Sequence, residues 1–239
     1  MFYLDPLYLA LAAPGMLLGM WAQWRVKSAF SRWSEVRTRR GMTGAEVAAA
    51  ILRQQQVQGI RIEQVSGFLS DHYDPTDRTL RLSPDVFHGQ SVAAAGIAAH
   101  EVGHAIQHAD AYAWLGLRSK LVPVLQITNR TSMPLIVGGM VLASVGVAAL
   151  GQLAFQLGAI LFGFTALFQI VTLPVEIDAS RRALRVLDRG QILQGEELTG
   201  ARAVLSAAAW TYVAAAISSL LTLLYYLMRS GLLGGRSRD

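Results

Sequence analysis

The feature that most constrains this chain is a run of 45 residues, 131–175, that contains no Asp, Glu, Lys or Arg. Two shorter uncharged runs lie at residues 6–24 and 203–228. A helix rises about 1.5 Å per residue, so roughly 20 apolar residues cross a hydrocarbon core about 30 Å thick. The outer runs are each long enough for one crossing and the middle run for two. The sequence therefore predicts an integral membrane protein.

Positive charge is distributed unequally between the segments that these runs separate. Residues 25–130 and 176–202 together carry 18 of the 21 Lys and Arg residues, and the remaining three follow the last run. Because Lys and Arg concentrate on the cytoplasmic side of a membrane, we expect four transmembrane helices with both polar segments in the cytoplasm. The first run follows Asp5 and precedes the basic residues, so we interpret it as a retained anchor and not as a secretory signal.

The resulting prediction is a mainly α-helical membrane protein with about four transmembrane helices and a small α+β domain at the membrane surface. The middle run is expected to turn near residues 151–152, between two helices of the minimum crossing length. The expected segments are a first transmembrane helix at 6–24, a cytoplasmic-side region at 25–130, a transmembrane hairpin at 131–174, a polar helix at 175–202, a fourth transmembrane helix at 203–228 and a tail at 229–239.

Within the first polar region, local signals predict two helices and two strands. Thr43 and Glu46 have the spacing of a capping box, which starts a helix. Residues 60–65 and 79–83 alternate apolar and polar side chains and flank a turn, so we expect a small β-hairpin. Residues 91–108 are rich in Ala and free of Pro, which predicts one continuous helix.

That Ala-rich helix carries the sequence His-Glu-Val-Gly-His at residues 100–104. Residues four apart on a helix face the same way, so His100 and His104 can both present imidazole nitrogens to one zinc ion. Glu101 lies about 100° around the helix, where its carboxylate can take a proton from an attacking water. This is the H-E-x-x-H arrangement of a metalloprotease.

A catalytic zinc site has three protein ligands and an open position. His108 continues the spacing, but three ligands spread along two helical turns lie too far apart for one tetrahedral ion. The longer motif that ends in a third His is absent, because Gln107 and Asp110 occupy the relevant positions. Glu176 and Asp178, the first charges after the hydrophobic hairpin, are the other candidates, since carboxylates at a membrane boundary are costly without partners.

Four sequence segments are informative when taken together. They are Asp-His-Tyr-Asp-Pro at 71–75, Leu-Arg-Leu-Ser at 80–83, Ala-His-Glu-Val-Gly-His-Ala-Ile-Gln at 99–107 and Leu-Pro-Val-Glu-Ile-Asp-Ala-Ser-Arg-Arg-Ala at 173–183. In this order they resemble, over most of the chain, the bacterial YugP-like neutral zinc metallopeptidases of the membrane. That family looks related to the membrane gluzincins, in which a Glu on a later helix completes the metal site. The resemblance implies a zincin-like catalytic domain, with Glu176 as the third zinc ligand.

This chain departs from those gluzincins at one position. They usually place an Asp four residues after the ligand Glu, whereas Ser180 stands there and Asp178 follows Glu176 by two residues. Asp178 is therefore a candidate for supporting the site, and a swap of ligand from Glu176 to Asp178 stays open.

Two further groups of residues are candidates for contact with substrate. His72 or Tyr73 can supply a hydrogen-bond donor to the transition state, although such clusters often only fix a turn. An extended peptide can add to an edge strand through main-chain hydrogen bonds. The residues of that predicted edge are Leu80, Arg81 and Leu82.

These features predict a membrane-embedded zinc endopeptidase that acts on peptides or membrane-protein segments from the cytoplasmic side of the bacterial cell membrane. The alternative is a membrane zinc-binding or transport protein without hydrolysis, but transport favours ionisable residues at the bilayer midplane, and the uncharged runs hold none. The chain has no Cys, so any metal ligands are His and carboxylate. Arg residues beside hydrophobic runs suit the lipid surface, and no nucleic-acid partner is expected. The sequence does not indicate an oligomeric state.

Overall fold

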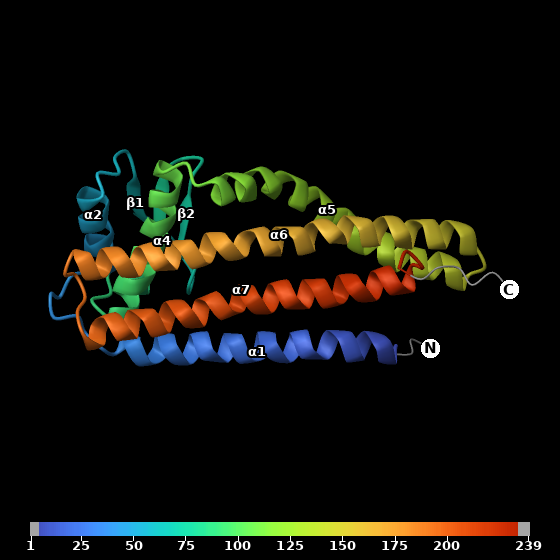
Figure 1. The fold of residues 1–239 in the computed structure, drawn as a ribbon, viewed down its shortest axis with the longest axis horizontal. Helices are drawn as coiled ribbons and strands as arrows, with labels where there is room; N and C mark the ends of the chain where they lie inside the picture. Colours follow the sequence, from blue (N-terminus) through green and yellow to red (C-terminus); the bar gives the residue numbers. More distant parts are fainter. Residues whose placement is uncertain (1–4, 234–239) are drawn as a thin grey trace. The chain divides into compact units, whose positions relative to one another are not determined.

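The structure, a computed structural model, describes residues 5–233 and is mainly helical with one small sheet (Figure 1). The predicted class of a helical protein with a small α+β part is confirmed at that level. Along the chain the elements are α1 (Pro6–Ser34), α2 (Gly44–Gln54), β1 (Arg61–Gln64), β2 (His72–Asp74), β3 (Thr79–Leu82), α3 (Pro84–Phe87), α4 (Val92–Ala109), α5 (Ala113–Ser144), α6 (Ala148–Arg189) and α7 (Glu196–Arg229).

The chain forms two compact units, each described by itself. The helical unit comprises Met1–Met20, Leu117–Leu173 and Tyr212–Asp239. The site unit comprises Trp21–Gly116 and Pro174–Thr211, and it contains the sheet together with α2, α3 and α4.

An apolar core holds the site unit together. Ile51 of α2, Leu80 and Leu82 of β3, and Leu187 of α6 are fully buried in it. Helix α2 is fixed at its start by the predicted capping box, in which Thr43 and Glu46 bond to each other's backbone N–H groups. Figure 1 shows α2, the strands and α4 gathered in this unit. These large aliphatic side chains from three elements pack in one core with Val102 of α4, which holds α4 within the unit.

The sheet differs from the predicted hairpin. Its order is β1-β3-β2, with β1 parallel to β3 and β2 antiparallel to β3. The prediction that residues 60–65 and 79–83 pair as a hairpin is therefore wrong, because the turn at residues 75–78 belongs to β2 and β3. The short strand β2 escaped detection because three residues are too few to show an alternating pattern.

Helices α4 and α6 approach each other closely in the site unit. A Cβ placed on Gly103 would lie only 2.5 Å from the carbonyl oxygen of Ala179 and 3.1 Å from its carbonyl carbon. Ala179 is itself fully buried. The absence of a side chain at Gly103 is thus what allows the two backbones to meet.

In the helical unit, α5 and α6 also pack backbone to backbone. A Cβ on Gly139 would lie 2.6 Å from the carbonyl oxygen of Gly151. The helices are joined at residues 145–147, where Gly146 has a φ of +91°. The predicted turn near residues 151–152 is wrong, because Gly151 serves as a helix-packing position and the chain reverses at Gly146 instead.

Hydrogen bonds in this unit link the C-terminal end of α7 to α6 and to the start of α1. The side-chain amides of Gln152 and Gln156 both donate to the carbonyl oxygen of Ser230, at 2.6 and 2.9 Å. The hydroxyl of Tyr225 donates to the carboxylate of Asp5 at 2.8 Å. Each of these polar groups therefore has a hydrogen-bond partner within the protein, which lowers the cost of removing it from water.

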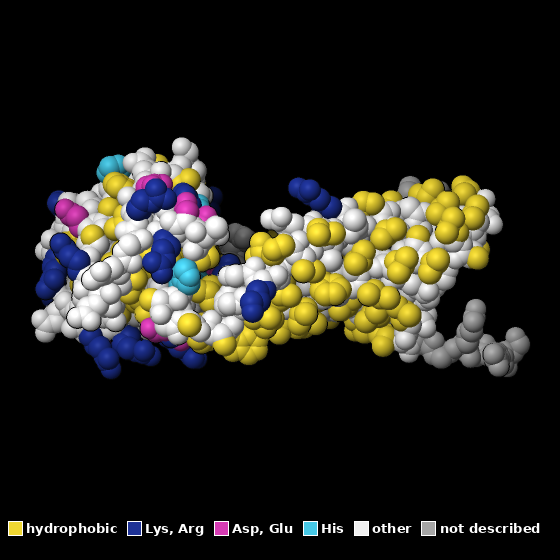
Figure 2. Space-filling model, turned by 90° about the horizontal axis from the view of Figure 1, so that it is seen from above, with side chains coloured by type: hydrophobic (Ala, Val, Ile, Leu, Met, Phe, Trp, Pro, Cys, Tyr) yellow, Lys and Arg dark blue, Asp and Glu magenta, His cyan; other side chains and the backbone are white. Residues whose placement is uncertain are grey.

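Large apolar side chains are exposed along the helical unit, and Figure 2 shows hydrophobic side chains spread over its visible face. Examples with at least 50% exposure are Met16 and Leu17 of α1, Leu153 and Ile160 of α6, and Ile127 of α5. By length and composition, two of the described helices, α6 and α7, can cross a membrane, where the sequence predicted four crossings. Helix α5 carries Arg118 and Lys120 within its first three turns and contains Pro123 and Pro134.

The predicted polar helix at 175–202 is not a separate helix. Helix α6 continues through Pro174 to Arg189, the chain reverses at Gly190 and Gln191, and α7 starts at Glu196. Likewise α1 continues to Ser34, beyond the predicted boundary at residue 24. Of the predicted tail, residues 234–239 lie outside the described residues.

The contact at Gly103 generates a stability prediction. In Gly103→Ala the added methyl group must push α4 and α6 apart, which costs about 1–3 kcal/mol. This loss exceeds the gain of up to about 1 kcal/mol from replacing Gly within a helix. We expect a lower midpoint of thermal unfolding in detergent.

Gly116→Ala in the first turns of α5 is the matched control, because nothing lies within 4 Å of its new methyl group. It should unfold at the same temperature as the parent or above it. Equal midpoints for the two variants would show that the α4–α6 contact is not tight.

Candidate metal centre

Helix α4 places the two predicted histidines in a largely buried position. The hydroxyl of Ser91 caps the helix by accepting from the N–H of Ala94 at 3.2 Å. Small side chains on several sides let the helix pass through the core with little exposure. His100 and His104 retain side-chain exposures of 12% and 9%. The pair therefore lies within the protein and still reaches a small open surface.

Helix α6 brings Glu176 to these histidines. Its Oε2 lies 3.1 Å from Nε2 of His100 and 3.5 Å from Nε2 of His104. Within the part of the chain that the structure describes, His100, His104 and Glu176 form a metal-compatible cluster, with one ligand atom from each residue within 4.8 Å of the others. Glu176 is 2% exposed. A carboxylate so deeply buried needs partners of this kind.

Glu101 lies next to this cluster and is also buried, with an exposure of 8%. Burial is the main cause that raises the pKa of Glu101, to about 7, and the nearby carboxylates of Glu176 and Asp71 also raise it. The adjacent His100 and a hydrogen bond from the backbone of Tyr73 act in the opposite direction. The carboxyl is thus poised to exchange a proton near neutral pH.

The second nitrogen of each histidine ring also has a partner. Nδ1 of His104 donates to Oε1 of Gln107 at 3.0 Å, and Nδ1 of His100 lies 3.1 Å from Oγ of Ser180. Both rings are therefore oriented with Nε2 toward Glu176. The sequence reasoning did not predict this contact of Gln107, although its position three residues after His104 is a helical spacing that allows such a bond.

Comparison with known proteins identifies the family. Residues 8–231 match the family described as "Putative neutral zinc metallopeptidase". The chain belongs to this family. It is 44% identical over 222 residues to the "Putative membrane protease YugP" of Bacillus subtilis (strain 168), which covers 93% of this chain and 95% of that protein. No solved structure matches the chain.

The side chains of the cluster fit the zinc ion that the family name implies. Two His nitrogens and one carboxylate oxygen are a donor set used by catalytic zinc sites. Ligand atoms about 2.0–2.1 Å from a tetrahedral zinc lie about 3.3 Å apart. The two His-to-Glu176 distances are 3.1 and 3.5 Å, and all three ligand atoms lie within 4.8 Å of one another. The cluster can therefore hold one zinc and leave a fourth position open.

The other candidate ligands lie elsewhere. Nδ1 of His108 bonds to the hydroxyl of Tyr73 at 2.8 Å. The Oδ2 atom of Asp178 accepts from Nε2 of Gln107 at 2.9 Å and from Nε of Arg182 at 2.6 Å. The structure thus brings Glu176 to the two histidines, while Asp178 and His108 hold neighbouring groups.

The two candidate transition-state donors have different surroundings. The side chain of His72 is exposed, and its Nδ1 lies 2.8 Å from the carbonyl oxygen of Ser70. The hydroxyl of Tyr73 is engaged by His108.

The predicted substrate edge at Leu80, Arg81 and Leu82 is wrong. These residues form β3, which is the middle strand and pairs with β1 on one side and β2 on the other. Because both ladders are occupied, β3 has no free edge for a peptide. The outer strand nearest to the cluster is β2, whose Tyr73 bonds to Glu101 through its backbone.

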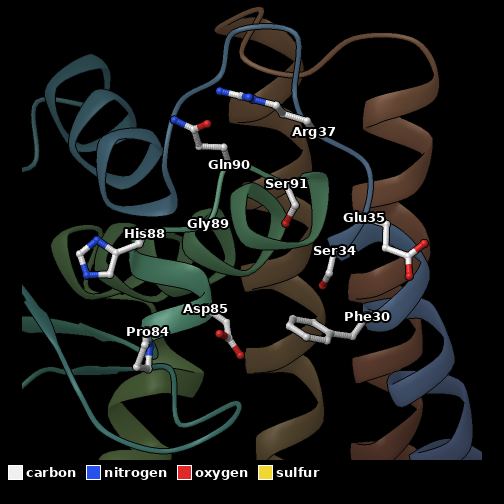
Figure 3. Close-up of a pocket in the computed structure, with 10 residues that line it drawn as sticks. All are labelled: Phe30, Ser34, Glu35, Arg37, Pro84, Asp85, His88, Gly89, Gln90 and Ser91. Carbon is white, nitrogen blue, oxygen red and sulfur yellow. The ribbon is translucent and has the colours of Figure 1, made fainter.

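A separate pocket of about 500 Å³ lies between the end of α1 and α3 (Figure 3). Phe30 and Asp85 point into it, and Ser91 lines it at the start of α4. The ring of His88 points away from it and bonds to Gln64 at 2.9 Å. His100, His104 and Glu176 do not line this pocket, so it is separate from the candidate metal site.

The cluster generates a prediction on metal removal. A ligand that binds only the folded state stabilises it by about 2.7 kcal/mol when its free concentration is 100 times its Kd. Zinc should therefore raise the midpoint of thermal unfolding of the detergent-purified protein, and a chelator should lower it.

Glu176→Gln removes one anionic ligand and should abolish most of this zinc-dependent shift. Asp178→Asn is the control, because Asp178 lies outside the cluster, and it should retain a clear shift. A full shift in Glu176→Gln together with no shift in Asp178→Asn would assign the third ligand to Asp178.

Proposed function

We propose that the protein is a membrane-embedded zinc-dependent endopeptidase that hydrolyses peptide bonds with an activated water. The observation that carries this proposal is the convergence of three metal-ligating side chains, His100, His104 and Glu176, beside the buried carboxyl of Glu101. Membership of a family named for zinc peptidases supports the same chemistry.

His100, His104 and Glu176 are the residues that would hold the zinc. When bound, zinc supplies Lewis acidity to the scissile carbonyl and lowers the pKa of the attacking water. As zinc ligands the two histidines would bind through neutral imidazole nitrogens, and the carboxylate of Glu176 would offset part of the charge of the divalent ion.

Glu101 is the proposed general base. Its carboxylate takes a proton from the attacking water and passes it to the leaving amine as the peptide bond breaks. The pKa of about 7, caused mainly by burial, lets the group work in both directions near neutral pH. His72 and Tyr73 stay the proposed donors to a substrate carbonyl; the side chain of His72 is exposed, and the hydroxyl of Tyr73 bonds to His108.

The proposed substrates are peptides or membrane-protein segments, and the proposed location is the bacterial cell membrane. Exposed apolar side chains along the helical unit and the similarity to a protein described as a membrane protease support a location in the bilayer. We propose four crossings, with the metal centre in the cytoplasm, because the two polar segments carry most of the positive charge.

The decisive variant is Glu101→Gln. It keeps the shape of the side chain and all three proposed ligands but removes the base, so zinc content should stay near one per chain while kcat for casein falls by about 10²- to 10⁴-fold. Zinc is measured by elemental analysis of the detergent-purified protein, and hydrolysis is measured in the same preparation.

Glu176→Gln is the companion variant and should lose both zinc and hydrolysis. If the parent binds zinc but neither it nor Glu101→Gln cleaves peptides, metal handling without hydrolysis becomes the better interpretation. A parent without zinc would refute the metal centre itself.

The topology can be tested by cysteine labelling, because the chain has no Cys of its own. Ser66→Cys lies on an exposed loop of the site unit, and Ser144→Cys lies exposed at the end of α5. With a membrane-impermeant maleimide on intact spheroplasts, Ser144→Cys should label and Ser66→Cys should label only after permeabilisation. The reverse pattern would place the metal centre outside the cytoplasm.

A further inference from the structure

Gln107 stands out among the residues around the proposed metal centre because it is polar and completely buried, with an exposure of 0%. Its side chain makes three hydrogen bonds: Oε1 accepts from Nδ1 of His104, while Nε2 donates to the carbonyl oxygen of Val175 at 2.8 Å and to Oδ2 of Asp178 at 2.9 Å. This one amide therefore connects His104 on α4 to residues on either side of Glu176 on α6, one before it and one two positions after it.

The surroundings of Gln107 determine which way its amide points. A side-chain amide can usually be turned over, because its oxygen and nitrogen have similar shapes. Here the carbonyl of Val175 can only accept, and Oδ2 of Asp178 already accepts from the guanidinium of Arg182 at 2.6 Å. A flipped amide would place its oxygen against two acceptors. The nitrogen must face α6, and the oxygen must face His104.

This orientation in turn determines the tautomer of His104. The amide oxygen of Gln107 is an acceptor only, so Nδ1 of His104 must carry the hydrogen. In the neutral ring Nε2 is then left with a free lone pair, and Nε2 is the atom that faces Glu176 at 3.5 Å. That is the tautomer a zinc ligand requires.

His100 provides an internal contrast. Its Nδ1 lies 3.1 Å from the hydroxyl of Ser180, and a hydroxyl can either donate or accept. Ser180 can orient the ring of His100 but does not dictate its tautomer. The surrounding protein thus specifies the tautomer of His104 but not the tautomer of His100.

We propose that Gln107 is a positioning residue that presets His104 for zinc, and that Asp178 and Arg182 act by fixing the orientation of Gln107. This inference rests on the proposed function, because it assumes that the cluster binds zinc. It gives Asp178 a role that does not require contact with the metal. Arg182 is held on its other side by Asp110 and by the ring of Tyr112, 5.7 Å from the guanidinium carbon.

The test compares zinc affinity in Gln107→Met and Gln107→Glu, measured with the full-length protein in detergent against a chromophoric chelator. Met fills the same space without an acceptor, so affinity should fall about 10- to 100-fold, as for other partners of metal-binding histidines. A Glu at this fully buried position beside Asp178 is expected to be the neutral acid. Its carbonyl oxygen then accepts from His104 while its O–H donates toward α6, so Gln107→Glu should retain clearly more affinity than Met. Asp178→Asn removes one charge that orients Gln107 but leaves the carbonyl of Val175 as an acceptor, so it should lose less than Gln107→Met.

A purely structural role for Gln107 predicts a different result, because zinc affinity would then follow the loss of folding stability in each variant and the spectrum of the bound metal would stay the same. Glu197→Gln is the matched control: Glu197 is another buried side chain of the site unit, 7% exposed, whose bonds go to the backbone N–H groups of Arg39 and Gln194. It should leave zinc affinity unchanged. The visible absorption of the cobalt-substituted protein should change in Gln107→Met and not in Glu197→Gln.

Zinc affinity in Gln107→Met within about twofold of the parent would overturn the inference. So would equal losses in Gln107→Met and Gln107→Glu. The proposed function fails separately, if the parent itself binds no zinc or if Glu101→Gln still cleaves peptides.

Discussion

The close approach of α4 and α6 is the constraint on which the rest of the site depends. Gly103 lies directly against the backbone of Ala179, and both belong to the segments that carry the proposed ligands. Glu176 comes within 3.1 Å of His100 because no side chain separates the two helices at that level. Gln107 then uses the same proximity to bond to Val175 and Asp178. Packing of two backbones thus positions both the ligands and the groups that orient them.

Much of the site could be predicted from sequence because it depends on local spacing. His100, Glu101 and His104 occupy one helix, so the helical period alone places them together. Glu176 could be proposed only through the family resemblance and the cost of a carboxylate at a membrane boundary. The sequence analysis named the positions of Gln107 and Ser180 but did not predict their contacts with the histidine rings, because a glutamine or serine in a helix has no distinctive pattern. Their roles follow from a tertiary contact between residues 68 to 80 positions apart.

The errors in the fold have a similar origin. The strand predicted from the alternation at residues 79–83 is present as β3. Periodicity does not show which strand pairs with it, and β2, with three residues, is too short to give a recognisable alternating pattern. Gly151 was taken as a turn because Gly often marks one, yet it allows close helix packing, and Gly146 with its positive φ makes the turn. Length and hydropathy alone identify two helices that can cross a membrane, α6 and α7. The proposal of four crossings therefore rests on the distribution of Lys and Arg along the chain.

The apolar core of the site unit has a consequence for the fate of this protein in a cell. Ile51, Leu80, Leu82 and Leu187 bury their side chains without involving the ligand atoms. In small zinc domains the ion replaces a core, and the chain unfolds without it. Here the apolar core can hold the fold when the proposed metal is absent. For the proposed zinc site this means that a newly made chain can fold before zinc binds, and that a chain that has lost zinc during metal starvation can bind it again instead of being degraded and replaced.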